Sequence, residues 1–196
     1  MKILLTGCAG FIGYHLCLSL LKKKNNTIIG IDNLNNYYDV SLKKMRLTNL
    51  LLKKNFIFKK ININNKKETR KIFLKYKFDK VIHLAAQAGV RYSIKFPDAY
   101  IKTNINGFYN LLKESKDFNV KHFMFASSSS VYGDIKNSKL TESLKTDQPL
   151  SLYAATKKTN ELMAYSFSNI YKLQITGMRF FTVYGPYGRP DMAIYK

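Results

Sequence analysis

The stretch Ile3–Leu21, ILLTGCAGFIGYHLCLSLL, decides the fold that we predict for this chain. It begins as an apolar β-type run, passes through glycines at positions 7, 10 and 13, and continues with helical periodicity. In such a unit Gly7 allows a sharp turn, Gly10 lets a pyrophosphate approach the backbone, and Gly13 lets the helix pack closely on the strand. The amides at the helix start then favour an anion. The stretch therefore predicts a dinucleotide-binding βα unit.

A second apolar strand, Thr27–Ile31, ends at Asp32. An acid at this place accepts hydrogen bonds from the adenosine ribose hydroxyls and repels a 2′-phosphate. Three glycines alone would be weak evidence, but the preceding strand, the following helix and this acid agree. The pattern predicts NAD rather than NADP.

The rest of the chain alternates strands with helices. Apolar runs predict strands at 56–63, 80–85, 122–126 and 173–181, and periodicity predicts helices at 39–53, 66–76, 98–117 and 152–171. This alternation is typical of an α/β fold, here a Rossmann-type doubly wound parallel sheet. No linker interrupts residues 1–181, which we expect to form the NAD-binding domain. Residues 182–196 are expected to begin a truncated domain that binds a sugar nucleotide.

Composition restricts the class of protein. With 46% hydrophobic and 14% aromatic residues in 196, the chain is expected to be globular. Its apolar runs are too short for a bilayer, and no leader precedes the first strand, which predicts a cytoplasmic protein without membrane contacts. Cys8 and Cys17 do not form a disulfide framework, and no metal-ligand spacing occurs, so both are interpreted as apolar fillers.

The net charge of +21 raises the alternative of a nucleic-acid binder. Only five of the 33 basic residues are Arg, and the Lys are scattered in twos and threes. Readout of bases favours Arg, so this alternative loses support. We interpret the charge as a basic surface that attracts an anionic substrate, and expect no nucleic-acid partner.

A second group of residues indicates catalysis. Tyr153 and Lys157 are four residues apart on a predicted helix and therefore share a face. Tyrosine, with a pKa of ~10, is a poor base at neutral pH. A neighbouring ammonium and an oxidised nicotinamide would stabilise its phenolate. The serines at 127–130 supply a hydroxyl at the end of the preceding strand. For Tyr132, a packing role is as plausible as a functional one.

At these residues the chain resembles the extended short-chain dehydrogenase/reductase family, the NAD-dependent epimerases and dehydratases, and most closely its UDP-glucuronate 4-epimerases. The resemblance covers the whole chain. Four segments carry it: DNLNNYYD at 32–39, HLAAQAGVRYS at 83–93, YAATKK at 153–158 and RFFTVYGPYGRPDMA at 179–193. The second and fourth are more particular to glucuronate epimerases.

The resemblance implies roles for individual residues. Tyr153 would be the base, Lys157 would hold the nicotinamide ribose, and Ser128 would be the strand-end hydroxyl that shares the substrate oxygen. Sugar-nucleotide contacts are implied for Ser128, Ser129, Arg91, Thr182 and Arg189. The cofactor-binding set would be Gly7, Gly10, Phe11, Ile12, Gly13, Asp32, Asn33, Asn62, Ile63, Ala85, Ala86, Gln87, Asn104, Tyr153 and Lys157.

The implied reaction is transient oxidation at C4 of a UDP-sugar, which converts UDP-glucuronate to UDP-galacturonate. Tyr153 would take the proton of the 4-hydroxyl, and NAD would be regenerated when hydride returns to the other face. A 4-keto uronate readily loses its carboxylate, so Arg189 would hold that group with its planar fork. The alternative for Arg189, and equally for Arg91, is a solvated loop charge.

Three positions depart from the family pattern. Ser129 and Ser130 stand where related dehydratases and decarboxylases carry an acid before Val-Tyr-Gly, so elimination and decarboxylation lose support. Asn62 stands where relatives tend to have an Asp that contacts adenine. Tyr187 replaces a usual Trp.

Two further readings of the function stay open. One is another nucleotide-sugar enzyme, such as a UDP-glucose 4-epimerase or a decarboxylase. The other is an inactive NAD-binding fragment, because family members exceed 300 residues and much of the uridine-binding surface is expected to lie beyond Lys196. The family also implies a homodimer through the helices near 98–117 and 152–171.

Overall fold

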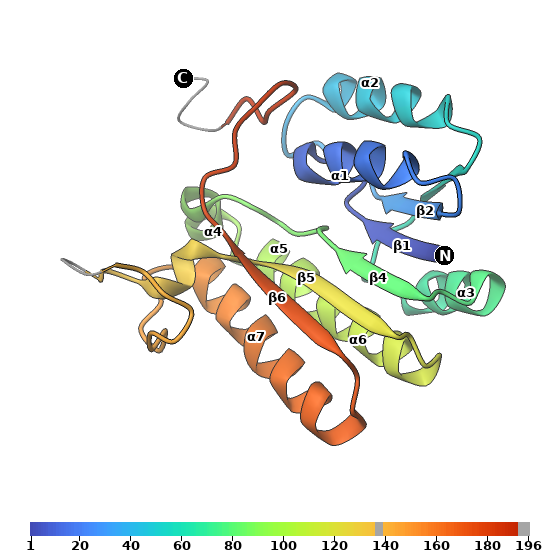
Figure 1. The fold of residues 1–196 in the computed structure, drawn as a ribbon. Helices are drawn as coiled ribbons and strands as arrows, with labels where there is room; N and C mark the ends of the chain where they lie inside the picture. The colour runs from blue at the N-terminus through green and yellow to red at the C-terminus, as the bar shows by residue number, and fades with distance from the viewer. Residues whose placement is uncertain (136–138, 192–196) are drawn as a thin grey trace.

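The computed structural model describes residues 1–135 and 139–191, and these form a sheet with helices on both faces (Figure 1). Six strands pair in parallel in the order β3-β2-β1-β4-β5-β6. Their bounds are β1 Lys2–Thr6, β2 Thr27–Asp32, β3 Phe56–Lys60, β4 Lys80–His83, β5 His122–Ser128 and β6 Ile175–Phe180. The predicted α/β doubly wound fold is confirmed.

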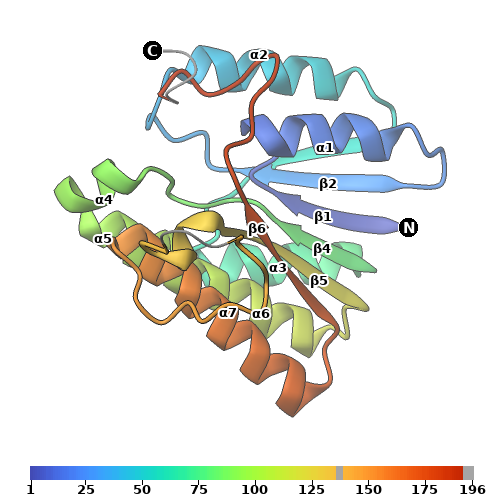
Figure 2. The same cartoon turned by 60° about the vertical axis from the view of Figure 1, so that its left-hand side comes forward.

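The helices form two layers, one on each face of the sheet. Helices α1 (Phe11–Leu21) and α2 (Val40–Leu51) cover one face, and α3 (Lys66–Tyr76), α6 (Phe108–Asp117) and α7 (Leu152–Tyr171) cover the other (Figures 1 and 2). Short elements stand between the longer ones along the chain. They are α4 Val90–Lys95, α5 Pro97–Tyr100, the π-helical η1 Ile101–Gly107 and the 3₁₀ turn η2 Ser129–Tyr132. Strands that are consecutive in the chain are thus joined by helices that cross a face of the sheet, as parallel strands require.

The two layers follow from the alternation of side chains along a strand. In β1, Ile3 and Leu5 pack beneath α1 and α2, whereas Leu4 between them packs toward α3, α6 and α7. Ile28 and Ile29 of β2 divide in the same way. Because successive side chains point to opposite faces, a strand covered on both sides must be apolar at nearly every position. The continuous apolar runs of the sequence are therefore the signature of this central sheet.

Three predicted strands extend further than the observed ones, and the one predicted at 173–181 is observed at Ile175–Phe180. The strand predicted at 56–63 ends at Lys60, because Asn62 forms a turn by accepting the Asn64 amide at 3.0 Å. The strand predicted at 80–85 ends at His83, which pairs with the last residue of β1, Thr6. The chain leaves the sheet there, and the Ala85 amide donates to the Thr6 hydroxyl at 3.1 Å.

The helix predicted at 98–117 is continuous but not uniformly α-helical. It begins as α5, widens into the π-helical η1 over Ile101–Gly107 and ends as α6. Helix α4, before it, was not predicted because six residues show too little periodicity. A π-helical turn brings an extra residue into the helix and frees a backbone carbonyl for another partner. In η1 the carbonyl of Asn104 accepts from the Asn160 side chain of α7 at 2.6 Å.

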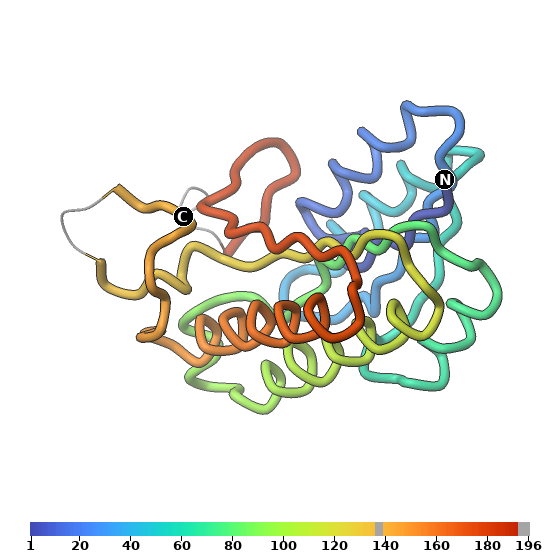
Figure 3. Tube along the Cα trace, turned by 60° about the horizontal axis from the view of Figure 1, so that its bottom comes forward, coloured from blue at the N-terminus to red at the C-terminus, as the bar shows by residue number. Residues whose placement is uncertain are grey.

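The segment after β6 returns over the opposite layer. It leaves the sheet at Phe180 and runs toward α1 and α2, where the His15 ring bonds the Pro186 carbonyl at 2.8 Å (Figures 1 and 3). Residues 192–196, part of the predicted second domain, lie outside the described residues. Cys8 and Cys17 are buried and free, which confirms their interpretation as fillers. Within the described residues, no helix has the length and apolar character needed to cross a membrane.

Gly13 fixes how closely α1 approaches the turn before it. A Cβ added at Gly13 would overlap the Gly7 carbonyl oxygen. We predict that Gly13→Ala lowers the free energy of unfolding by about 1–3 kcal/mol, because backbone rather than a flexible side chain must move. Urea unfolding followed by circular dichroism measures this. Ser19→Ala, on the exposed side of the same helix, is the control and should change stability by less than about 0.5 kcal/mol.

Candidate active site

A cleft with a volume of about 470 Å³ lies at the carboxyl edge of the sheet. Strand order reverses between β1 and β4, the point where ligands bind in open α/β sheets. Most of the residues predicted from the sequence line this cleft: Gly7, Gly10, Phe11, Ile12, Gly13, Asp32, Asn33, Ile63, Ala85, Ala86, Gln87, Ser128, Ser129, Tyr153, Lys157, Thr182 and Arg189.

The glycine turn forms the floor of one end of the cleft. Gly7 has a φ of +72°, and a Cβ there would lie 2.8 Å from the Ala85 amide nitrogen. Its own amide donates to the Ile31 carbonyl at 2.8 Å. Gly10 is the N-cap of α1 and brings no side chain to the space before the helix. The first amides of α1 consequently face the cleft without a protein side chain over them, which suits a phosphate group.

Asp32 lies at the end of β2, beside the glycine turn. One carboxylate oxygen accepts the Leu34 amide at 2.8 Å, and the other accepts the Ala9 amide at 3.2 Å. Burial raises the pKa of Asp32, while these amides and the nearby Lys43 and Arg46 oppose the rise. The two amides hold the carboxylate rigidly at the rim, as an acceptor for hydroxyl groups requires.

Tyr153 and Lys157 lie on α7, and their side chains reach the end of the cleft opposite the glycine turn. Ser151 caps this helix by accepting the Ala154 amide at 3.1 Å, which places Tyr153 in the first turn. Lys157 is buried, donates to the Ala126 carbonyl of β5 at 2.8 Å, and has its pKa lowered to about 8 by burial. The ammonium nitrogen lies 5.9 Å from the centroid of the Tyr153 ring.

The expected lowering of the tyrosine pKa is not produced by the protein groups alone. Burial raises the pKa of Tyr153, and the hydrogen bond from Ser128 and the charge of Arg189 only partly oppose this. The Lys157 ammonium is directed to a carbonyl rather than to the phenol, which is why burial dominates. A further positive charge near the ring is needed to bring the phenol into working range.

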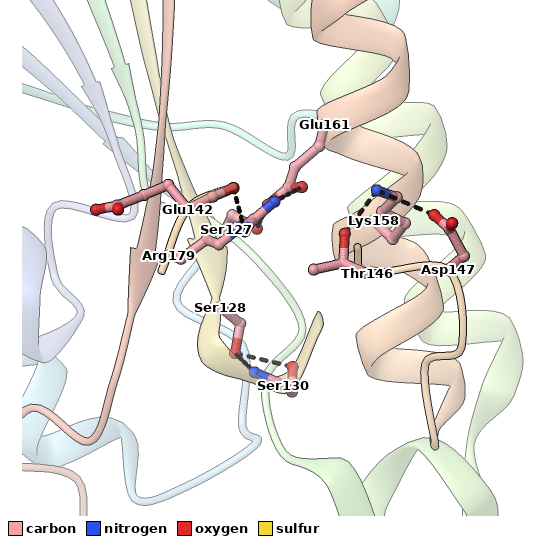
Figure 4. Close-up of polar contacts among 9 residues, drawn as sticks. All are labelled: Ser127, Ser128, Ser130, Glu142, Thr146, Asp147, Lys158, Glu161 and Arg179. Carbon is pink, nitrogen blue, oxygen red and sulfur yellow. Dashed lines mark hydrogen bonds and ion pairs between the residues drawn. The ribbon is translucent and has the colours of Figure 1, made fainter. Parts of the chain in front are cut away.

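The strand-end serines are ordered around Ser128. Its hydroxyl oxygen accepts the Ser130 amide at 3.2 Å and the Ser130 hydroxyl at 2.9 Å, as Figure 4 shows. With its lone pairs occupied, the Ser128 proton is free to be donated, and Tyr153 is its partner. The phenol and this hydroxyl therefore form one polar group at the cleft wall.

An ion pair behind the serines locks α7 to the sheet. Arg179 of β6 donates to both carboxylate oxygens of Glu161 at 2.9 Å, and Ser127 donates to the same carboxylate at 2.6 Å (Figure 4). Burial tends to raise the pKa of Glu161, but Arg179 and Ser127 outweigh it and lower the value. Tyr132 is buried beneath the Arg179 guanidinium, which lies 4.9 Å from its ring centroid, and it packs rather than lining the cleft.

Three predicted residues lie outside the cleft lining. Asn62 is exposed in the turn after β3, and Arg91 is exposed on α4. Asn104 is buried below the cleft, where its side chain accepts the Gln87 amide at 2.8 Å and donates to the Gln87 carbonyl at 3.0 Å. It also donates to the Thr156 hydroxyl at 3.1 Å, so it joins the loop after β4 to the helix of Tyr153.

Sequence reasoning missed several residues near Asp32 that line the cleft. Asn35, Tyr37, Tyr38 and Lys43 lie there, and Lys43 donates to the Asn35 carbonyl at 2.7 Å. Its ammonium nitrogen also stands 4.5 Å from the centroid of the Tyr38 ring. The sequence offered two signals here, the segment DNLNNYYD at 32–39 that carries the family resemblance and the polar stretch between a strand end and a helix. Both mark a binding loop without naming its contacts.

Arg189 reaches the cleft already bound to an internal carboxylate. Its fork donates to both oxygens of Asp191, at 3.0 and 2.7 Å, and the Tyr37 hydroxyl donates to the same carboxylate at 2.9 Å. Burial opposes the charged form, but Asp191 overrides burial and raises the pKa of Arg189. The guanidinium fork of Arg189 thus lies at the cleft paired with a carboxylate of the same chain.

A parallel sheet with a glycine turn at its switch point and a Tyr-x-x-x-Lys helix beside it defines a dinucleotide-binding fold of the short-chain dehydrogenase type. The family model described as GDP-mannose 4,6 dehydratase matches residues 4–196, and the chain belongs to this family.

Two named relatives show which members of the family this chain is similar to. Protein CapI of Staphylococcus aureus is 53% identical over 196 residues, which are 100% of this chain and 58% of that protein. The UDP-glucuronate 4-epimerase of Thermodesulfobacterium geofontis is 49% identical over 193 residues, covering 98% of this chain and 59% of its own. The chain thus spans roughly three fifths of the length of both relatives.

Solved structures agree with this likeness. The UDP-glucuronic acid 4-epimerase from Bacillus cereus, in complex with UDP-glucuronic acid and NAD, matches with a TM-score of 0.93 and 39% identity over 100% of this chain and 61% of that one. The UDP-glucose 4-epimerase from Thermotoga maritima, with UDP-glucose, matches with a TM-score of 0.82 and 34% identity over 98% and 59%.

His83 is a buried titratable group beneath the cleft. Its Nδ1 bonds the Thr6 hydroxyl at 2.7 Å, and burial together with the charge of Lys157 lowers its pKa to about 3. The unfolded chain, with an ordinary histidine pKa of ~6.5, then binds one more proton than the folded chain between these two values. The stability that neutral His83 contributes to the folded state is fully present above about pH 6.5 and is lost as the pH falls toward 3.

We predict that His83→Gln flattens the acid side of the stability profile. Between about pH 6.5 and 3, the wild type should lose up to about 1.4 kcal/mol per pH unit more than the variant. Urea unfolding at a series of pH values measures the difference. Parallel profiles for the two proteins would show that this histidine is not held neutral.

Proposed function

We propose that the protein is an NAD-dependent 4-epimerase of UDP-glucuronate, which converts it to UDP-galacturonate by transient oxidation at C4. The observation that carries the proposal is the common cleft of the glycine turn, the Tyr153–Ser128 pair and the Arg189 fork. The 49% identity to a UDP-glucuronate 4-epimerase supports the same substrate.

The dinucleotide end of the cleft fits NAD. The glycine turn leaves the start of α1 open to a pyrophosphate, and Asp32 stands where ribose hydroxyls would be accepted and a 2′-phosphate repelled. When bound, NAD supplies the acceptor and then the donor of the hydride at the sugar C4. Ala85, Ala86 and Gln87 would line its path between the two ends.

The proton is handled by α7 and β5. Tyr153 would take the proton of the 4-hydroxyl and return it after the sugar turns, while Ser128 would donate to the same oxygen. Lys157 would hold the nicotinamide ribose and contribute positive charge near the phenol. A buried tyrosine with a raised pKa needs a cationic ring beside it to become a base, which links proton removal to a correctly seated cofactor.

Carboxylic acids are scarce at the reacting end. Asp32 is the sole Asp or Glu among the described residues of the cleft lining, and it lies at the adenosine end. Ser129 and Ser130 therefore offer no acid to protonate a departing hydroxyl or an enolate carbon. This favours epimerisation over the dehydration for which the family model is described.

The remaining expectations are part of the same proposal. Residues 182–191 would begin the portion that binds the sugar nucleotide, because Thr182 and Arg189 line the cleft. Asn62 and Arg91 would contact the bound ligands only from the margins of the cleft. A homodimer would form through the exposed apolar side chains Ile101, Tyr109 and Leu162, and the enzyme would work in the cytoplasm.

The direct test is turnover of UDP-glucuronate by the 196-residue chain and by any longer form of the protein, with products resolved by chromatography. UDP-galacturonate is the expected product, and Tyr153→Phe should lower kcat by at least about 100-fold, the contribution of a positioned base. Tyr165→Phe, on the exposed side of the same helix, is the control and should keep full activity. A UDP-pentose product, or turnover of UDP-glucose alone, would contradict the assignment.

Asp191 should compete with the substrate for Arg189. We predict that Asp191→Asn lowers the KM for UDP-glucuronate by roughly fivefold, because a neutral amide yields the guanidinium more readily than a carboxylate does. Steady-state kinetics at constant NAD measure the change. An increase in KM would mean that Asp191 orients the fork instead of competing with the substrate.

A further inference from the structure

Arg46 is a fully buried cation outside the reacting groups described above. It lies on α2 with 0% of its surface exposed, and no ion pair of the described residues includes it. Its Nε has no partner. The charge of Arg46 opposes the rise in the pKa of Asp32, but the Asp32 carboxylate bonds the Leu34 and Ala9 amides instead of the guanidinium. A buried charge without a hydrogen-bonded carboxylate costs stability, and an apolar side chain of similar size would serve the core better. The presence of an arginine at position 46 is therefore better explained by the hydrogen bonds that its guanidinium donates.

The guanidinium binds oxygens from three separate segments. One terminal nitrogen donates to the Ala9 carbonyl at 3.0 Å and to the Tyr38 hydroxyl at 2.8 Å. The other donates to the Tyr187 carbonyl at 2.6 Å and to the Gly188 carbonyl at 3.4 Å. All three segments border the cleft: the glycine turn, the loop after β2, and the turn that precedes Arg189.

The turn at 185–188 is shaped for this attachment. Tyr187 has a φ of +58°, a left-handed conformation, and the Gly188 amide donates to the Gly185 carbonyl at 3.2 Å. The Tyr187 ring packs edge-on against the Tyr14 ring of α1, with the two ring centroids 5.8 Å apart. Figures 1 and 2 show the segment after β6 crossing from the sheet to α1 and α2. The turn is thus held against the layer that also carries the glycine turn.

We propose that Arg46 is a positioning residue that ties the turn before Arg189 to the glycine turn, so that the carboxylate fork is presented at the cleft. The inference rests on the proposed function, because it assigns Arg189 to the sugar carboxylate. Lysine has the same charge but cannot span two directions from one planar group, which explains why arginine stands here. Together with the His15–Pro186 and Tyr37–Asp191 hydrogen bonds, this guanidinium joins the dinucleotide half of the site to the sugar half.

Arg46→Lys tests the proposal with two independent measurements. Hydrogen exchange read by mass spectrometry should show amides of residues 185–189 exchanging about tenfold faster, while α3 stays protected. The KM for UDP-glucuronate should rise about tenfold, with kcat within about threefold and the Kd for NAD within about threefold. A general loss of packing would instead change exchange throughout the domain.

Two controls keep the outcome decisive. Arg70→Lys, at a half-exposed arginine on α3 paired with Glu114, should change neither measurement. If Arg46→Lys does not fold, His15→Gln releases the same turn at the Pro186 carbonyl and should give a smaller rise in exchange and in KM.

Unchanged exchange at 185–189 would overturn the tether whether or not the protein is an epimerase. Faster exchange with an unchanged KM would overturn its link to Arg189. Absence of turnover in the wild type, with the exchange result as expected, would refute the proposed function and leave the tether standing.

Discussion

The close contact of the Gly7–Gly13 turn with β4 and α1 is the constraint on which the rest of the structure depends. A side chain at Gly7 would meet the backbone at Ala85, and one at Gly13 would overlap the Gly7 carbonyl. The contact lets α1 begin directly over the end of β1, with its first amides facing the cleft. It also fixes β4 beside β1, and the strand order reverses between them. The binding edge of the sheet follows from that packing.

Burial of polar groups defines the two ends of the cleft. Asp32 at one end is held by two amides, and Tyr153 at the other is held by Ser128, with Lys157 buried nearby against a carbonyl. Removing these groups from water shifts their pKa values against the charged form. A cationic nicotinamide ring would favour the charged form of Tyr153, whereas an anionic sugar would favour the charged form of Lys157.

The polar contacts beneath the cleft connect elements that are distant in sequence. Asn104 joins the loop after β4 to α7, the Glu161–Arg179 pair joins α7 to β6, and Arg46 joins α2 to the turn after β6. Each of these side chains bonds a partner from another element of the fold. Site geometry therefore depends on the relative placement of the layers and on more than the residues that line the cleft.

The sequence by itself determined the sheet, its strands and about half of the cleft lining, because apolar runs, glycine spacing and the Tyr-x-x-x-Lys interval are local signals. Strand ends at 60 and 83, the π-helical turn at Asn104 and the places of Asn62 and Arg91 were decided only by the tertiary structure. The same holds for Asp191 at the Arg189 fork and for Arg46. These features depend on contacts between residues as far as 154 positions apart, and no local pattern encodes which buried oxygen a cation will meet.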